Sequence, residues 1–233
     1  MEHNTVIKIV QYDNFVAKLD LSQRAFDNLL TVDLGVFGSS MHSKDIFDVQ
    51  QLFYSAASQN PTFSTGMNAK GGWDKNTTAS QINHPMALLG EKNDEKSMNF
   101  NTHLKLTFDV MKDLRLTLFG SYTYISTENA QFCPTWVWAQ GQAYRGEHKQ
   151  EDWFSNLTLD YRHTWGVHHL AATLLGEYQK SNRSGFWTLV KGFTTNLFGY
   201  DNLAAGSTIP YGGTGSGYES PALGSLMGSF TYT

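Results

Sequence analysis

The sequence predicts an all-β fold: one segment of an antiparallel transmembrane β-barrel, with about seven long strands. Three observations support this. Apolar and polar residues alternate over stretches of about 10 to 13 residues, longer than the usual strand of about 5–6. Short and long connections between these stretches take turns along the chain. Hydrophobic residues make up 40% of the chain, aromatic residues 14% and charged residues only 16%, with 21 glycines, a balance that favours strands and turns.

The clearest alternation covers residues 98–124. From Met98 to Val110 the even positions are apolar except for Thr102, and the odd positions are polar. The pattern resumes from Leu114 to Tyr124. The other predicted strands cover roughly residues 6–21, 30–37, 153–162, 168–179 and 224–232. A membrane-spanning strand needs only about 9–11 residues, half of which can be polar, so these stretches are long enough.

The connections alternate in length. Short ones are predicted near residues 22–27, 111–113 and 165–167, and long ones over about 41–96, 127–151 and 181–222. Outer-membrane barrels have short periplasmic turns and long extracellular loops. We therefore expect the apolar face of the strands to meet lipid and the polar face to meet a water-filled lumen.

One short helix is expected in the first long loop. Ile46, Val49, Leu52, Phe53 and Ala56 have helical spacing. We predict Ser43 as the N-cap and Pro61 as the helix end.

Aromatic residues are expected at both margins of the apolar band. With the short turns on the periplasmic side, one group falls at the outer margin and another at the inner margin. The outer group is Tyr122, Tyr124, Trp153 and Tyr178, and the inner group is Trp165, Phe230 and Tyr232. Aromatic belts at both interfaces are typical of membrane barrels.

The odd strand number predicts an incomplete barrel. The first and last of seven strands cannot pair antiparallel to close a ring, and an open edge in lipid costs several kcal/mol per unpaired backbone group. We therefore expect residues 1–233 to be part of a barrel domain, without the C-terminal strands. The N-terminus lacks a basic region followed by an apolar core, so no signal peptide is expected.

Five segments resemble SusC-like (RagA-type) TonB-dependent outer-membrane transporters. They are FVAKLDLSQRAFDNLLTVDLGVFGS at 15–39, the helical loop ending in NPTF at 60–63, NHPMALL at 83–89, GFTTNLFGYDNLAAG at 192–206 and LGSLMGSFTYT at 223–233. In the last segment, Gly228 and Ser229 stand where the family usually has Gly-Arg.

The resemblance implies the middle section of a barrel with about 22 strands in the bacterial outer membrane, with the plug domain outside this chain. It implies import of bulky nutrients, either oligosaccharides or peptides. The implied partners are a SusD-like surface lipoprotein acting as a lid, TonB acting through the plug, outer-membrane lipid, and the glycan or peptide ligand.

Four aromatic residues are candidates for ligand contact: Trp136, Trp138, Tyr144 and Trp73. The first three are predicted in an outer loop, where flat rings could stack on sugar faces. Packing of the loop or contact with the lid protein explains such residues at least as well.

The sequence predicts no enzyme, cofactor or metal site. His163, His168 and His169 surround a tight turn, but adjacent strand residues such as His168 and His169 point to opposite faces. Cys133 is the single cysteine, which excludes an internal disulfide. A net charge of −4 without a basic block argues against a nucleic-acid partner.

Two alternatives remain open. A soluble carbohydrate-binding β-sandwich would pack the apolar side chains, for example Leu104, Leu116, Leu159 and Leu174, between two sheets. A passive porin-like channel would have the same wall without plug or lid.

Overall fold

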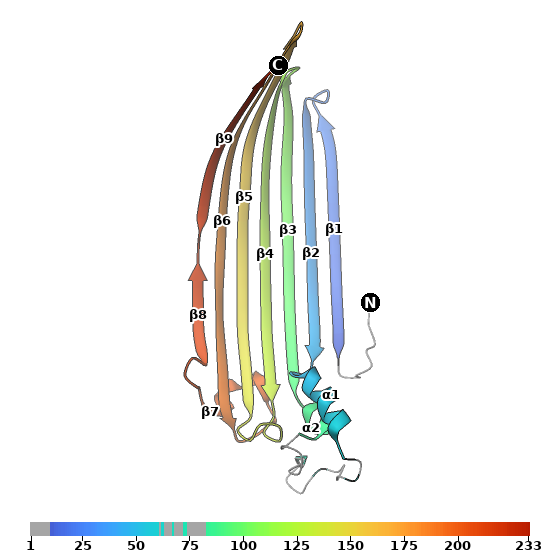
Figure 1. Cartoon of the computed structure of the whole chain (residues 1–233), viewed down its shortest axis with the longest axis vertical. Coiled ribbons are helices and arrows are strands. Elements are labelled where there is room, and N and C mark those ends of the chain that lie inside the picture. The colour runs from blue at the N-terminus through green and yellow to red at the C-terminus, as the bar shows by residue number, and fades with distance from the viewer. Residues whose placement is uncertain (1–9, 61, 63–66, 68–71, 74–82) are drawn as a thin grey trace.

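The computed structural model describes residues 10–60, 62, 67, 72–73 and 83–233. Its strands form one antiparallel sheet (Figure 1). They are β1 (Gln11–Ala25), β2 (Leu30–Asp45), β3 (Lys92–Met111), β4 (Leu114–Cys133), β5 (Gln142–Trp165), β6 (His168–Phe193), β7 (Gly206–Thr208), β8 (Thr214–Glu219) and β9 (Ala222–Tyr232). Two short helices, α1 (Val49–Ser58) and α2 (Pro85–Leu88), and two 3-10 turns, η1 (Gly199–Asp201) and η2 (Leu203–Ala205), lie outside the sheet.

The sheet is seven strands wide, as predicted. Strands β1 to β6 pair in sequence order, and β7, β8 and β9 all pair with β6, one after another along its length. Among the described residues β1 pairs only with β2, so the sheet is open. This confirms an incomplete barrel, and the β-sandwich alternative is wrong because the described strands form a single sheet.

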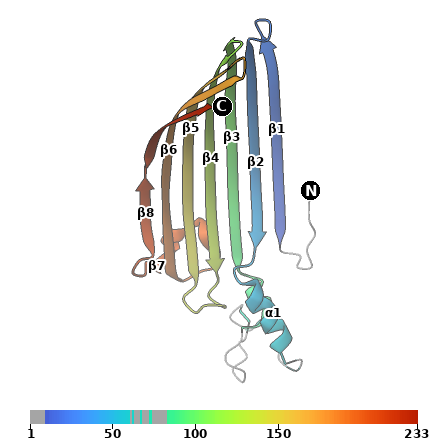
Figure 2. The same cartoon turned by 45° about the horizontal axis from the view of Figure 1, so that its top comes forward.

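Short and long connections lie at opposite ends, as expected (Figure 1). The turns at 26–29, 112–113 and 166–167 lie at the upper end, whereas 46–91, 134–141 and 194–205 connect at the lower end. Gly166 supplies a positive φ of 62° in the β5–β6 turn. Figure 2 shows that this hairpin bends across the top of the sheet.

The predicted lengths of two loops are wrong. Strand β4 continues to Cys133 and β5 begins at Gln142, so the loop expected at 127–151 shrinks to 134–141. Strand β6 continues to Phe193, and β7 and β8 pair with it inside the predicted loop 181–222. Both faces are largely polar in the extensions of β4 and β5, and residues 186–190 of β6 carry large apolar side chains on both faces. Alternation therefore disappears although the backbone pairing continues.

The predicted helix starts later than expected. Strand β2 runs through Asp45, which places Ser43 in a strand, and the cap of α1 is Asp48. The Gln51 backbone N–H donates to Asp48 Oδ1 at 2.8 Å. Pro61 lies outside the described residues.

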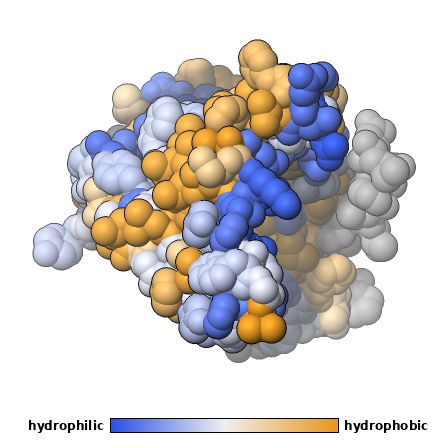
Figure 3. Space-filling model, turned by 90° about the horizontal axis from the view of Figure 1, so that it is seen from above, coloured by the Kyte–Doolittle hydropathy of each residue, from blue (hydrophilic) through white to orange (hydrophobic). Residues whose placement is uncertain are grey.

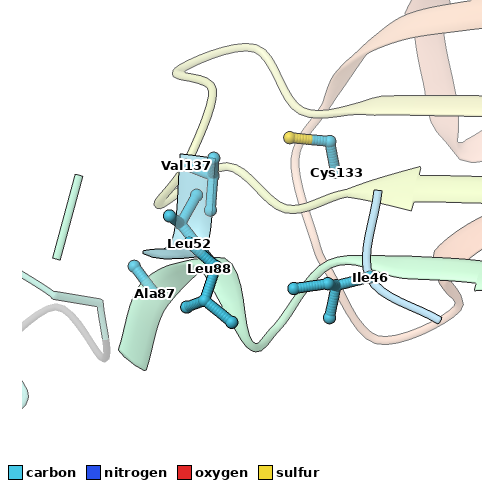
Figure 4. Close-up of a cluster of buried hydrophobic side chains, with 6 residues drawn as sticks. All are labelled: Ile46, Leu52, Ala87, Leu88, Cys133 and Val137. Carbon is cyan, nitrogen blue, oxygen red and sulfur yellow. The ribbon is translucent and has the colours of Figure 1, made fainter. Parts of the chain in front are cut away.

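Two small cores lie on opposite faces of the sheet at the long-loop end. Core A consists of Ile46, Leu52, Ala87, Leu88, Cys133 and Val137 (Figure 4). Core B consists of Phe132, Ala143, Val190 and Phe193, with Tyr200, Leu203 and Ala205 packed against it. Phe132 and Cys133 are consecutive strand residues and therefore belong to different cores. The Tyr200 hydroxyl donates to Asp94 Oδ2 at 3.2 Å, and burial together with Asp94 raises the Tyr200 pKa to about 12.

The rest of the sheet has no core. Every buried hydrophobic side chain among the described residues belongs to core A or core B. Viewed from the short-turn end, hydrophobic side chains form a continuous tract at the surface (Figure 3). None of the described helices is long and apolar enough to cross a membrane.

Candidate functional site

The apolar residues of the strands share one face of the sheet, which we call the apolar face. The register aligns Phe108, Leu116, Leu159 and Leu174 in one row across β3 to β6. Leu104 has the same parity as Phe108 and lies on the same face. The side chains of this face are not buried in a protein core: Leu104 is 41% exposed, and Leu118, which lies two residues from Leu116 on the same face, is 44% exposed. Leu104, Leu116, Leu159 and Leu174, which a β-sandwich would pack between two sheets, therefore lie on one side of a single sheet.

The long-loop margin of the apolar face shifts by a regular step from one strand to the next. On the long-loop side the largely apolar stretch of each strand ends at Met98, Tyr124, Trp153 or Tyr178 on β3 to β6. Beyond intervening polar residues, Phe132, Phe186 and Val190 lie further along the same face. Tyr124 pairs with Phe100, Trp153 with Tyr122, and Tyr178 with Ser155. Each margin residue therefore lies two residues nearer the short-turn end than the one on the preceding strand.

The short-turn end shifts in the same direction. Strand β3 continues to Met111, beyond Phe108, the partner of Leu30. Strand β5 continues to Trp165, beyond Tyr161, the partner of Leu114. The apolar band thus keeps a similar length on each strand while it crosses the sheet diagonally. About 12 steps of about 3.4 Å make the band about 40 Å long along a strand, which would correspond to a height of about 30 Å at the strand tilt of about 40° that membrane barrels have.

Aromatic rings mark the margin toward the long loops. The rings of Tyr122 and Trp153 lie 4.4 Å apart, and Lys180 is the next residue in the same row. Trp153 is 53% exposed. A long cationic side chain beside half-exposed rings is an arrangement typical of an interface between an apolar and an aqueous medium.

Five rings form a continuous ladder at the short-turn end. Tyr161, His163, Trp165, His168 and Tyr232 make successive ring contacts with centroid separations of 5.3 to 6.2 Å. His163 Nδ1 lies 2.6 Å from Asp113 Oδ2, and Tyr232 Oη lies 2.7 Å from His168 Nδ1. This ring ladder contains two of the three residues that the sequence places at the inner margin.

The opposite face, the polar face, carries threonine, amide and charged side chains. Thr31, Thr107, Thr117 and Thr158 form one row across β2 to β5. Arg115 Nε donates to Asp109 Oδ1 at 2.7 Å. The polar face also holds a strip of rings that the alternation did not predict: Phe119 lies 6.0 Å from His103 and 5.8 Å from Phe154.

Two of the four predicted contact residues pack within the protein. Trp136 donates through Nε1 to the Ala87 carbonyl at 3.3 Å and packs against core A. Trp73 stacks on His84 at 4.9 Å and also packs against core A. Trp138 lies in loop 134–141, where the Lys191 ammonium sits 5.1 Å from its ring centroid.

Tyr144 lies in strand β5 rather than in an outer loop. There it lines a recess of about 420 Å³ at the long-loop end of the polar face, shared with His148, Arg183, Trp187 and Glu219. Register places the five side chains on the same face of β5, β6 and β8. Sequence reasoning missed Trp187, although glycines at 185, 215 and 217 border it.

Glycines form the floor under these rings. A Cβ on Gly215 would lie 2.6 Å from Trp187 Cη2, and a Cβ on Gly146 would lie 2.6 Å from the Tyr144 hydroxyl. Both rings therefore lie close over bare backbone. Trp187 remains 41% exposed, so the recess offers an accessible flat ring beside charged groups.

Buried titratable groups lie near core A. Glu91 is buried, accepts from the Asp48 backbone N–H at 3.3 Å, and contacts Cys133 Sγ at 3.6 Å. Burial raises the Glu91 pKa. Burial also lowers the pKa of His84. In the described part of the chain no group of three or more His, Cys, Asp or Glu side chains could hold a metal ion.

Comparison with known proteins extends the fold assignment. No family model matches the chain, and no curated protein matches it. Chains from the RagAB peptide importer in its closed-closed and open-open states match with TM-scores of 0.70 and 0.71, at 15% and 14% sequence identity. A further RagAB peptide transporter structure matches with a TM-score of 0.70 at 15% identity. Each match covers 96% of this chain and 26% of the other, so this chain has the fold of about a quarter of those proteins.

Proposed function

We propose that this chain is part of the wall of a TonB-dependent outer-membrane transporter that imports bulky nutrients. The observation that carries the proposal is the diagonal apolar band on one face of a single open sheet. Because strands of a membrane barrel are tilted by about 35–45°, a level lipid layer crosses neighbouring strands at staggered positions. A soluble sheet has no reason to keep such a stagger.

The dimensions of the band agree with a membrane. Its height of about 30 Å matches the hydrocarbon thickness of about 30 Å. Polar side chains begin directly beyond the rings on the long-loop side: Glu151 follows Trp153 and Ser126 follows Tyr124 on the same face. The paired rings and the ring ladder would then lie at the two headgroup levels.

The polar face supplies the transport side of the wall. Threonine, amide and charged side chains suit a wetted lumen, and the recess at Tyr144 and Trp187 would face the extracellular mouth. Stacking on flat rings suits sugar faces as well as peptide side chains, so the ligand class stays open between the two. We propose a conduit role for this wall, with no bond made or broken.

The partners belong to the same proposal. The RagAB likeness and the sequence resemblance support a SusD-like lipoprotein lid, and TonB would act through a plug outside this chain. A passive porin-like channel would use the same wall, so the source of energy distinguishes the two functions.

Uptake by cells that carry the complete transporter tests the proposal. Deleting the gene should abolish uptake of the nutrient that supports growth, and so should a protonophore or loss of TonB. Trp187→Ala should reduce uptake with normal surface amounts of protein, while Trp138→Ala serves as a control ring outside the recess. Uptake that persists without an energised inner membrane would overturn the importer and favour the passive channel.

A further inference from the structure

A second cavity lies at the short-turn end of the polar face, far from the recess at Tyr144. It encloses about 450 Å³, and two rows of register-paired residues line it. One row consists of Arg162, Ala171 and Thr231, and the other of Thr164, His169 and Thr233. The small Ala171 side chain lies between Arg162 and Thr231, which leaves the space between them open.

The lining is rich in hydrogen-bond donors. Arg162 and His169 come from the strands, and Lys112 reaches the cavity from the neighbouring turn. The three threonine hydroxyls add further donors. All three basic side chains are exposed. Within the described residues, the side chains of Lys112 and Arg162 make no hydrogen bond or ion pair with the protein.

The charge of the cavity is unbalanced. Its single carboxylate, Asp113, is engaged by His163 Nδ1 at 2.6 Å. His169 Nδ1 lies 3.0 Å from Thr164 Oγ1. Two permanent cations and an imidazole therefore outnumber the one carboxylate in the lining, and Asp160, which borders the adjoining recess beside Lys112 and Arg162, accepts from Thr173 Oγ1 at 2.6 Å. An arginine fork beside a lysine is well suited to tetrahedral oxyanions.

We propose that this cavity binds a phosphoester group. Lys112 and Arg162 would pair with the phosphate oxygens, and the hydroxyls of Thr164 and Thr231 would complete the donor set. The volume exceeds that of a bare phosphate ion, so the substituent on the ester also has room. The group would come from a soluble phosphomonoester, because the cavity opens on the polar face, whereas the ring ladder at the same end of the sheet lies on the apolar face.

The test uses the complete transporter that contains this chain, purified in a neutral maltoside detergent. Calorimetric titration with glycerol 3-phosphate examines the soluble source. Lys112→Gln and Arg162→Gln each remove one cation from the cavity, and Lys105→Gln removes a matched cation from the polar face outside it.

Each charge-assisted contact is worth about 1.5–3 kcal/mol, so each cavity variant should bind about tenfold more weakly or worse. Lys105→Gln should bind as the unmodified protein does. Binding of glycerol 3-phosphate with this pattern of variants supports the site. Absence of glycerol 3-phosphate binding, or equal affinity in all variants, overturns it. Heat-modifiable mobility on gels verifies that each variant is folded.

Discussion

Substitutions at Leu118 and Met98 allow the effect of side-chain exposure on stability to be distinguished from the effect of the surrounding medium. Both lie on the apolar face, and they are similarly exposed, at 44% and 50%. On β4 the band runs from Leu114 to Tyr124, so Leu118 lies about 10 Å in height from the nearer margin. Met98 is itself a margin residue. If lipid surrounds this face, arginine at the two positions should have very different effects.

The expected cost can be estimated from depth. Arginine near the bilayer midplane of a barrel costs about 2–4 kcal/mol, and near an interface about 0–1 kcal/mol. Leu118→Arg should thus lower the folding equilibrium constant on the order of 30- to 800-fold, and Met98→Arg at most about fivefold. In water, substitutions at such exposed positions usually stay within about ±0.5 kcal/mol.

Urea titration of the complete transporter refolded into phosphatidylcholine vesicles would measure these differences. Thr117→Arg provides the matched control, because Thr117 neighbours Leu118 but lies on the polar face. Equal destabilisation by Leu118→Arg, Met98→Arg and Thr117→Arg would refute the assignment of the apolar face to lipid.

Three further outcomes are expected. Gly215→Val should displace the Trp187 ring and weaken ligand binding about tenfold or more. Gly217→Ala should not, because a Cβ at position 217 has nothing within 4 Å. Ligand titration would give equal affinities for the two variants if the recess plays no part in binding. Burial raises the Glu91 pKa above 4.5, so the folded state holds this proton more tightly than the unfolded state, and the Glu91 contribution to the free energy of unfolding falls as pH rises from 4.5 through the raised pKa. Thermal melts from about pH 4 to about pH 7 should show this loss in the unmodified protein and not in Glu91→Gln; parallel curves would contradict it. Residues 1–233 expressed alone should aggregate, because the described sheet has open edges at β1 and β9, and a monodisperse monomer in sedimentation analysis would count against the barrel.

Sequence reasoning worked where the two faces of a strand meet different surroundings. Residues 98–110 alternate because one face of the strand is apolar and the other is polar. That difference predicted both the position of the strand and which of its residues point to each face. The two leucine-rich strands around the turn at 112–113 were found for the same reason. Short turns were also found, because they lie between two strong patterns.

The pattern fails where both faces are polar. From Ser126 to Gln131, β4 has no apolar face, yet its backbone remains paired with β3 and β5. Backbone hydrogen bonds hold such strands without any side-chain signature. This explains why Tyr144 was predicted in a loop. Trp187 was missed for a different reason, because residues 186–190 carry large apolar side chains on both faces and do not alternate. Trp187 lies beside Gly215 and Gly217 because of the β6–β8 register, which no local sequence pattern specifies.

Accessibility along β4 tests the central claim most directly. Nitroxide labels placed singly at residues 114–124 of the complete transporter in vesicles can be probed with oxygen, which concentrates in lipid, and with a nickel chelate, which stays in water. Lipid on the apolar face predicts high oxygen accessibility at Leu116, Leu118 and Tyr122, and nickel accessibility at or near Thr117, Ser121 and Thr123, with a period of two. Even positions that are closed to oxygen, or open to the nickel chelate, would contradict a membrane-spanning wall.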